Sequence, residues 1–319
     1  MAEQRIFTER DDRFHFEEMA GDWWATETAW FSFSRPERRL GGWFYTMARP
    51  NIGTVAGGAW IWDDSAHLPW EALYSANYTA LELPRDQDLN DITLPTGVSI
   101  RVIEPCMSYE LSYNDDTRLQ AFLRFDGVMP PEPLTSTGST FGRSHHFDQI
   151  GRVSGEIVLH GETIPIDCLA VRDRTWGRRR EDRPRQAAYV TGVAGPEHGF
   201  LAVTNVEEKR NPVSYGFLYR DGRTHSLTQG ERRFERDSEN GWITRVELHA
   251  SDADGRELHA VGTPLSRTVI NRHTFIDINS LIQWDINGER GHGEDQDMWP
   301  VHRWSRMRRN ARSANEGTA

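Results

Sequence analysis

Cysteine is scarce in this chain of 319 residues, which holds only Cys106 and Cys168. The two cysteines lack the spacing of metal ligands, and a disulfide is not expected in a reducing compartment. The sequence has no run of 18 apolar residues, which excludes a transmembrane helix. Charged side chains are scattered through the first twenty residues and leave no room for the apolar core of a signal peptide. We therefore expect a cytoplasmic protein without a membrane span.

Several motifs of common enzymes are also missing. The sequence contains no phosphate-binding P-loop, no Gly-x-Gly-x-x-Gly after a strand, no Gly-x-Ser-x-Gly and no Cys-x-x-Cys. The net charge of −11 disfavours nucleic acid as a partner, because a negative surface repels the phosphate backbone. Residues 172–185 are rich in arginine but also contain acids, so we interpret them as a loop of ion pairs. The alternative is that one arginine holds a carboxylate or phenolate of a ligand.

Aromatic residues are abundant, with 12 Trp, 14 Phe and 8 Tyr. Short apolar segments alternate with turn signals about every ten residues, which is typical of an all-β sandwich or barrel. The Pro-rich stretch 126–142 resembles a linker. We therefore predict two β domains, residues 1–142 and 143–319, the second ending in a mobile tail. The tryptophans either fill two β cores or line a cavity for a flat or polyene-like ligand.

The stretch 145–180 predicts a β-hairpin that ends in a charged, aromatic turn. Residues 156–160 alternate up to Gly161, and Ile164, Ile166 and Cys168 resume with period two and would share a face. Residues 152–160 would then pair with residues 162–170. The hairpin is flanked by His-Phe-Asp-Gln at 146–149 and by Arg-Asp-Arg-Thr-Trp-Gly at 172–177. A hairpin folds back on itself, so these two ends can lie near each other.

These motifs, with Ile-Pro-Ile-Asp at 164–167 and Gly-His-Gly-Glu at 291–294, resemble the tandem lipocalin-like family. That family includes carotenoid 1,2-hydratases (hydroxyneurosporene synthases), AttH-like proteins and fungal decalin-forming Diels–Alderases. The resemblance spans roughly residues 20 to 300. It implies two lipocalin-like β domains packed against each other, with a site for a hydrophobic ligand between them. It selects no single reaction, because members of one fold perform different chemistry.

His146 and Asp148 form the densest group for proton transfer. On a strand they share a face, whereas His145 points the other way. A carboxylate beside an imidazole orients the ring and raises its basicity, as general acid–base catalysis requires. A structural role is the alternative. A metal site would need a third protein ligand, which the local sequence does not supply.

Asp173 and His273 are the other candidates for proton transfer. A carboxyl group beside Trp176 in an apolar cavity would have a raised pKa and could protonate an alkene or carbonyl. Alternatively, Asp173 pairs with a neighbouring arginine or caps the turn, and Trp176 fills the core. His273 and Asp277 would share a strand face, with a structural alternative open. His249 and His259 flank an Asp-Gly turn, and we expect them to form a surface pair.

We therefore predict a lyase or isomerase that needs no metal or cofactor. Hydration or dehydration, cyclisation and retro-aldol cleavage of a hydrophobic terpenoid, steroid or aromatic molecule all fit a placed acid–base pair in a dry aromatic cavity. A non-catalytic carrier of hydrophobic ligands is the first alternative and a structural interaction protein the second; a homodimer is left open. The predicted catalytic residues are His146, Asp148, Asp173 and His273, and the predicted substrate contacts are Arg172, Trp176, Trp24, Trp43, Tyr189 and Asp277.

Overall fold

The computed structural model describes residues 7–65, 67–133, 144–180, 185–207, 210–272 and 275–316. The chain is all-β, as predicted, and divides into two compact units. The first unit runs to Asp63 and resumes over Ala72–Arg179, and the second joins Asp64–Glu71 to Arg180–Ala319. In the part of the chain that the structure describes, no helix has the length and apolar character needed to cross a membrane.

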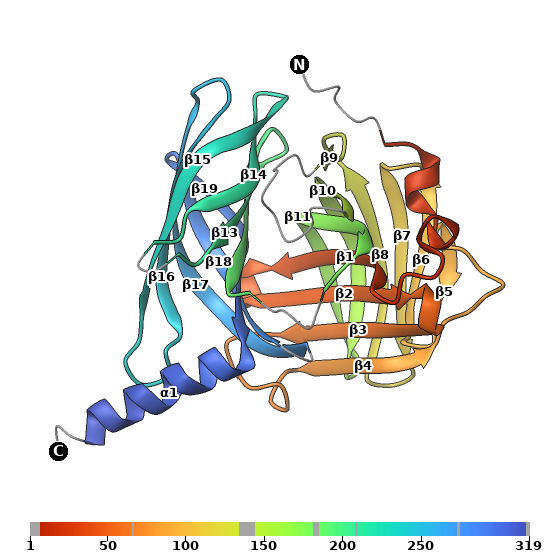
Figure 1. The fold of residues 1–319 in the computed structure, drawn as a ribbon, viewed down its shortest axis with the longest axis horizontal. Helices are drawn as coiled ribbons and strands as arrows, with labels where there is room; N and C mark the ends of the chain where they lie inside the picture. The colour runs from red at the N-terminus through yellow and green to blue at the C-terminus, as the bar shows by residue number, and fades with distance from the viewer. Residues whose placement is uncertain are drawn as a thin grey trace. The chain divides into compact units, whose positions relative to one another are not determined.

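The first unit is a curled half-barrel built from one antiparallel sheet (Figure 1). Its strand order is β4-β3-β2-β1-β11-β10-β8-β7-β6-β5, with the short β9 paired to β10. The strands are β1 Ala25–Arg35, β2 Leu40–Arg49, β3 Thr54–Trp62, β4 Tyr74–Glu82, β5 Asp91–Thr93, β6 Val98–Glu104, β7 Ser108–Asp115, β8 Leu119–Gly127, β9 Glu132–Pro133, β10 Ser144–Leu159 and β11 Glu162–Arg178. Four short 3-10 helices accompany them: η1 Glu9–Asp12, η2 Phe16–Met19, η3 Pro36–Arg38 and η4 Pro50–Ile52.

The inner face of this sheet forms an apolar core. Because successive strand residues point to opposite faces, every second residue of β1, β2 and β3 enters the core, as Phe31, Phe44 and Ala59 do. They meet Leu111 and Phe125 from β7 and β8. The opposite face of β1, β2 and β3 is also buried, so nearly every residue of these strands is shielded from solvent.

β3 carries a bulge at its two glycines, seen as a register shift between Val55 and Gly57. Gly57 has φ 108°, and a Cβ there would lie 2.1 Å from the carbonyl oxygen of Tyr45. Only glycine permits both this backbone conformation and this close approach of β2.

The predicted hairpin is β10 and β11, and it belongs to the first unit. β11 pairs with β1, and β10 pairs with β8, so the hairpin lies in the middle of the sheet and joins its two halves. The predicted boundary at 142/143 would place it in the second domain. Sequence favoured that boundary because prolines interrupt the pattern, yet Glu132–Pro133 pairs with β10 as a strand.

The second unit contains a closed antiparallel barrel of eight strands. They are β12 Ala187–Gly195, β13 His198–Asn205, β14 Val213–Arg220, β15 Arg223–Arg236, β16 Ile243–Asp252, β17 Glu257–Arg272, β18 Phe275–Ile286 and β19 Glu289–Pro300. Phe200, Leu248, Ile282 and Trp284 belong to its apolar core. Closure leaves no sheet edge unpaired.

The barrel core also holds an ion-pair layer. Arg232 donates two hydrogen bonds to Asp295, from Nε at 2.9 Å and from Nη2 at 2.7 Å. Asp297 accepts a 2.6 Å bond from Arg236. Arg232 and Asp295 are fully buried, so each charge depends on its partner in place of water.

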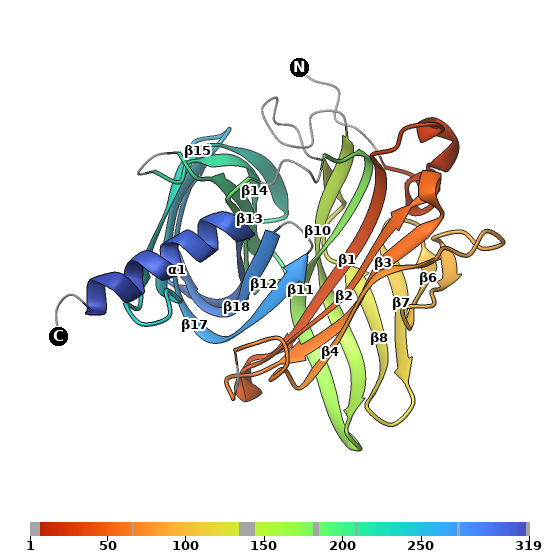
Figure 2. The same cartoon turned by 60° about the horizontal axis from the view of Figure 1, so that its bottom comes forward.

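Near the C-terminus, where we expected a mobile tail to follow the arginines of residues 303–312, the helix α1 (Val301–Glu316) lies at one end of the barrel (Figures 1 and 2). The helix begins directly after Pro300. Trp304 stacks on Trp242 at 5.7 Å and meets Trp299 edge-on at 5.5 Å. Arg308 also donates a 2.7 Å hydrogen bond to the Glu239 carbonyl oxygen. A few contacts therefore hold a helix that is otherwise rich in polar residues, which explains why the sequence resembled a solvated tail.

Candidate functional site

The pairing of β10 with β11 brings three predicted residues together on the first unit. His146 lies opposite Thr175, and Asp148 lies opposite Asp173. Side chains directly opposite on an antiparallel pair share a face. One ligand atom from each of His146, Asp148 and Asp173 lies within 4.8 Å of the others. The expected convergence of the two hairpin ends is therefore confirmed, and His145 points to the opposite face as expected.

His146 is held at both ring nitrogens. Nε2 lies 2.9 Å from Oδ2 of Asp148, and Nδ1 lies 2.6 Å from Oγ1 of Thr175. Burial by itself lowers the pKa of the His146 imidazole, but the charge and hydrogen bond of Asp148, with a contribution from Asp173, raise it overall. His146 and Asp148 are fully buried, whereas Asp173 is only half-buried. Of the three, Asp173 is the group best placed to meet a substrate.

Glu132 joins this cluster, and sequence reasoning missed it. It lies opposite Asp148 on β9, and 8 % of it is exposed. Burial, and then the neighbouring charge of Asp148, raises the pKa of the Glu132 carboxyl to about 7. The signal was hidden because Glu132 lies between two prolines in a stretch that resembles a linker.

This raised pKa predicts a pH dependence of stability. The folded protein binds the Glu132 proton more tightly than the unfolded chain, so the contribution is present at acidic pH and is lost as pH rises through about 7. The Glu132→Gln variant carries no such charge. We expect the variant to gain roughly 2–3 kcal/mol over the wild type between pH 5 and pH 8. Urea unfolding of both proteins at the two pH values measures this; a difference independent of pH would contradict it.

Trp30, not Trp176, is the aromatic neighbour of Asp173. Trp30 lies directly opposite Asp173 on β1, on the same face. It meets Trp43 at 5.4 Å, and Trp43 meets Trp60 at 6.4 Å and Trp62 at 6.1 Å, all edge to face. These four indoles, which we call the tryptophan cluster, are all buried. The predicted ligand residue Trp43 therefore shares a face with the acid–base residues.

Arg172 and Trp176 lie on the other face of β11, so the expected contact between Asp173 and Trp176 is wrong. Arg172 donates to Gln149 Oε1 at 2.7 Å and to the Tyr109 hydroxyl at 2.6 Å inside the core. Trp176 stacks on His15 at 4.3 Å. The arginines of this motif form a strand and not the loop that we predicted. These placements favour the structural alternative for Arg172 and Trp176.

Two other arginines act electrostatically near the site. The positive charge of Arg179 works against the raised pKa of His146. Burial, with a further contribution from Arg179, lowers the pKa of Arg49, which lies on the same strand face as Tyr45. Guanidinium groups bind carboxylates and phenolates well. Within residues 172–185, Arg179 acts electrostatically on His146, whereas Arg172 is held by Gln149 and Tyr109 in the core.

The remaining predicted residues are spread over both units. Trp24 is half-buried just before β1. Tyr189 on β12 and Asp277 on β18 are buried in the second unit. Asp277 pairs with Arg272 at 3.3 Å, and burial raises the pKa of Asp277 to about 6 although Arg272 opposes this. His273 lies outside the described residues.

Two groups of described side chains have the donor atoms for a metal ion. One is His146, Asp148 and Asp173, where strand pairing supplies the third ligand that the local sequence did not reveal. The other is Glu247, His249 and His259 on the barrel. The expected surface pair of histidines is confirmed, because His249 lies opposite His259 and both are exposed.

Comparison with known proteins shows the family. The family described as "Domain of unknown function (DUF7064)" matches residues 8–300. The chain belongs to this family. A comparison with curated protein sequences gives no match.

Solved structures share the fold. Kievitone hydratase from Nectria haematococca is 11 % identical with a TM-score of 0.55, and the match covers 93 % of this chain and 96 % of that one. CghA is 13 % identical with a TM-score of 0.55, covering 87 % and 88 %. A protein from Nitrosomonas europaea described as AttH is 14 % identical with a TM-score of 0.49, covering 89 % and 95 %. The resemblance inferred from the sequence motifs is confirmed at the level of fold.

Proposed function

We propose that this protein is a lyase or isomerase that uses acid–base chemistry, without a metal or redox cofactor, on a hydrophobic small molecule. The observation that carries the proposal is the cluster of buried His146 and Asp148 with half-buried Asp173, on the same sheet face as the tryptophan cluster. Ionisable groups that gather at a buried, aromatic-rich place in a fold are more frequent at functional sites than elsewhere. The fold shared with kievitone hydratase supports the choice of reaction class.

The geometry assigns different roles to the three residues. Asp173, the most accessible, would exchange a proton with the substrate. His146, held between Asp148 and Thr175, would act as a positioning residue that sets the charge around Asp173. Proton transfer by a placed group serves hydration, dehydration, cyclisation and retro-aldol cleavage alike. A terpenoid, steroid or aromatic substrate would use the indoles for apolar contact.

A ligand panel tests the proposal. Terpenoid, steroid and aromatic compounds, and any molecule that co-purifies, are titrated while tryptophan fluorescence is recorded, and mixtures are then analysed by mass spectrometry. We expect one class to change the fluorescence and to be converted, with deuterium or ¹⁸O taken up from labelled water according to the bond formed. Added chelator should leave the conversion unchanged.

The alternatives give different results. Saturable binding with no conversion, and equal binding by wild type and Asp173→Asn, would identify a carrier. An unchanged fluorescence signal across the panel would contradict the proposal that the protein binds a hydrophobic ligand. If added chelator stops the conversion, the reaction depends on a metal ion, and the proposal of metal-free acid–base catalysis is wrong.

A further inference from the structure

A second group of ionisable side chains lies on the outer wall of the barrel. The turn after β16 is fixed by Asp252, whose Oδ1 accepts backbone hydrogen bonds from Asp254 at 3.0 Å and Arg256 at 2.9 Å. This turn sets the pairing of β16 with β17, which places His249 directly opposite His259. Glu247 precedes His249 by two residues and therefore shares its face.

This face points to solvent. Leu248 and Ala250, the two neighbours of His249 on the strand, belong to the barrel core, so Glu247 and His249 project outward. The side chains of His249 and His259 are 52 % and 48 % exposed. A solute can reach them without any opening of the barrel. They are far in sequence and separate in unit from the residues of the proposed acid–base site.

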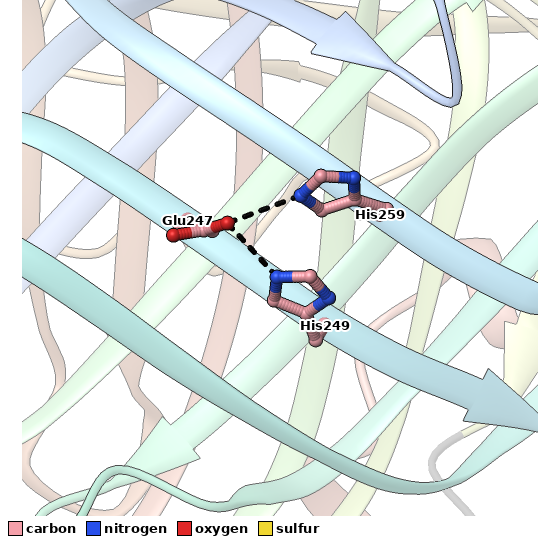
Figure 3. Close-up of side chains that lie close together, drawn as sticks. All are labelled: Glu247, His249 and His259. Carbon is pink, nitrogen blue, oxygen red and sulfur yellow. Dashed lines mark hydrogen bonds and ion pairs between the residues drawn. The ribbon is translucent and has the colours of Figure 1, made fainter.

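The three side chains converge on one point (Figure 3). Oε1 of Glu247 lies 2.9 Å from Nε2 of His249 and 3.1 Å from Nε2 of His259. The two imidazoles are stacked with centroids 4.1 Å apart and planes inclined by 19°. Both rings thus direct the same nitrogen toward the same carboxylate oxygen.

We propose that Glu247, His249 and His259 bind a divalent transition-metal ion of the zinc class. In a tetrahedral site with bonds of about 2.0–2.1 Å, neighbouring ligand atoms lie about 3.3 Å apart. The two N···O separations are within a few tenths of an ångström of that value, so small side-chain rotations suffice. Three protein ligands leave one position to water, which is the open form of a zinc site.

The donor set selects the class of ion. Two imidazole nitrogens and one carboxylate suit Zn²⁺, Ni²⁺, Cu²⁺ and Co²⁺, whereas Ca²⁺ and Mg²⁺ prefer oxygen ligands throughout. The ligands stand on two hydrogen-bonded strands, which hold them before the ion arrives. A bound ion would bridge β16 and β17 and stabilise the folded barrel by mass action. This inference does not depend on the proposed lyase or isomerase activity.

The test uses the full chain, freed of metal with chelator and then dialysed. Isothermal titration with Zn²⁺ should show one site, and Co²⁺ should give a visible absorption band that the hydrated ion lacks. His249→Ala and His259→Ala should each weaken Zn²⁺ binding by at least the ~10–100-fold seen for loss of groups that merely support a ligand. Both residues are exposed, so the melts of the metal-free variants should match the wild type.

His225→Ala is the matched control. His225 is another histidine of the barrel with a single carboxylate partner, Asp254 at 3.2 Å, so its loss should leave Zn²⁺ affinity unchanged. His146→Ala is the second control, because it dismantles the other set of donors. Absence of a stoichiometric site would overturn the proposal. So would binding that survives in both His249→Ala and His259→Ala but is lost in His146→Ala.

Discussion

Asp173→Asn is expected to lower the turnover of the substrate found by the ligand panel by about 10²–10⁴-fold, the usual cost of losing a placed acid or base. The substitution keeps the size of the side chain but removes its exchangeable proton and charge. Asp173 is half-buried beside Trp30, so the fold should tolerate the amide. Single-turnover rates and a thermal melt of the same preparation measure the two effects separately.

His146→Ala should lower turnover by a similar factor. The cause differs, because His146 positions the neighbouring side chains and sets the charge around Asp173. The variant leaves the buried Asp148 carboxylate without its imidazole partner, which will also reduce stability. His146→Gln keeps a hydrogen-bond donor and separates the two effects. If His146 sets the charge around Asp173, His146→Gln should shift the pH profile of the remaining activity, which a purely structural role would not do.

His145→Ala is the matched control, because it removes a neighbouring imidazole that faces the other way. We expect its rate to remain within a few-fold of the wild type. Full activity in Asp173→Asn, or a melt that collapses together with activity in that variant, would return the cluster to a structural role.

Arg232→Met is expected to destabilise the barrel by about 3–5 kcal/mol, since it leaves a buried carboxylate unpaired. Arg232 is 1 % exposed and holds Asp295 with two hydrogen bonds. At about 2–4 °C per kcal/mol for a domain of this size, the melting temperature should fall by roughly 10 °C. Burial already raises the pKa of Asp295 although Arg232 opposes it, so the loss should be larger at pH 8 than at pH 5.

The exposed pair Arg152 and Asp167 provides the control. Its side chains are each 61 % exposed although Nη2 and Oδ2 lie only 2.6 Å apart. Arg152→Met should therefore cost about 1 kcal/mol or less. The double variant Arg232→Met/Asp295→Leu should recover much of the lost stability, because an apolar pair can replace a buried ion pair. Equal melts for Arg232→Met and Arg152→Met would contradict this account.

Local patterns in the sequence predicted much of the first unit. Period two located the hairpin, and it showed that His146 and Asp148 share a face while His145 does not. These conclusions need only the geometry of one strand and one turn. The partner of a strand across a sheet is a long-range property. The neighbour of Asp173 on β1 is Trp30, some 140 residues earlier in the chain, and no local pattern indicates it.

The same limit explains the other differences. Arg172 and Trp176 are close to Asp173 in sequence. However, each is an odd number of residues from Asp173 along the strand, so both point to the opposite face of the sheet and are buried there. Glu132 lies next to Asp148 because β9 pairs with β10, and this pairing is not indicated by the local sequence. The helix α1 is held by residues outside it: Trp304 contacts Trp242 and Trp299, and Arg308 donates a hydrogen bond to the Glu239 carbonyl oxygen. In each of these cases, contacts with residues far away in the sequence determine where the side chain or helix lies, and the local sequence does not indicate them.

The unbroken pairing of β10 with β11, from Ser144 opposite Gly177 to Leu159 opposite Glu162, limits how this hairpin can change in length. Deleting one residue from either strand would exchange its two sides. If the residue is lost from β11 between the tip and Asp173, Asp173 moves to the position of Arg172 on the core face, and Arg174 takes its place beside Trp30. Paired additions at the tip, around His160 and Gly161, would move no side chain to the other face. The hairpin can therefore become longer or shorter at its tip. The number of residues between the motif at 146–149 and the motif at 172–177 can change only by an even number.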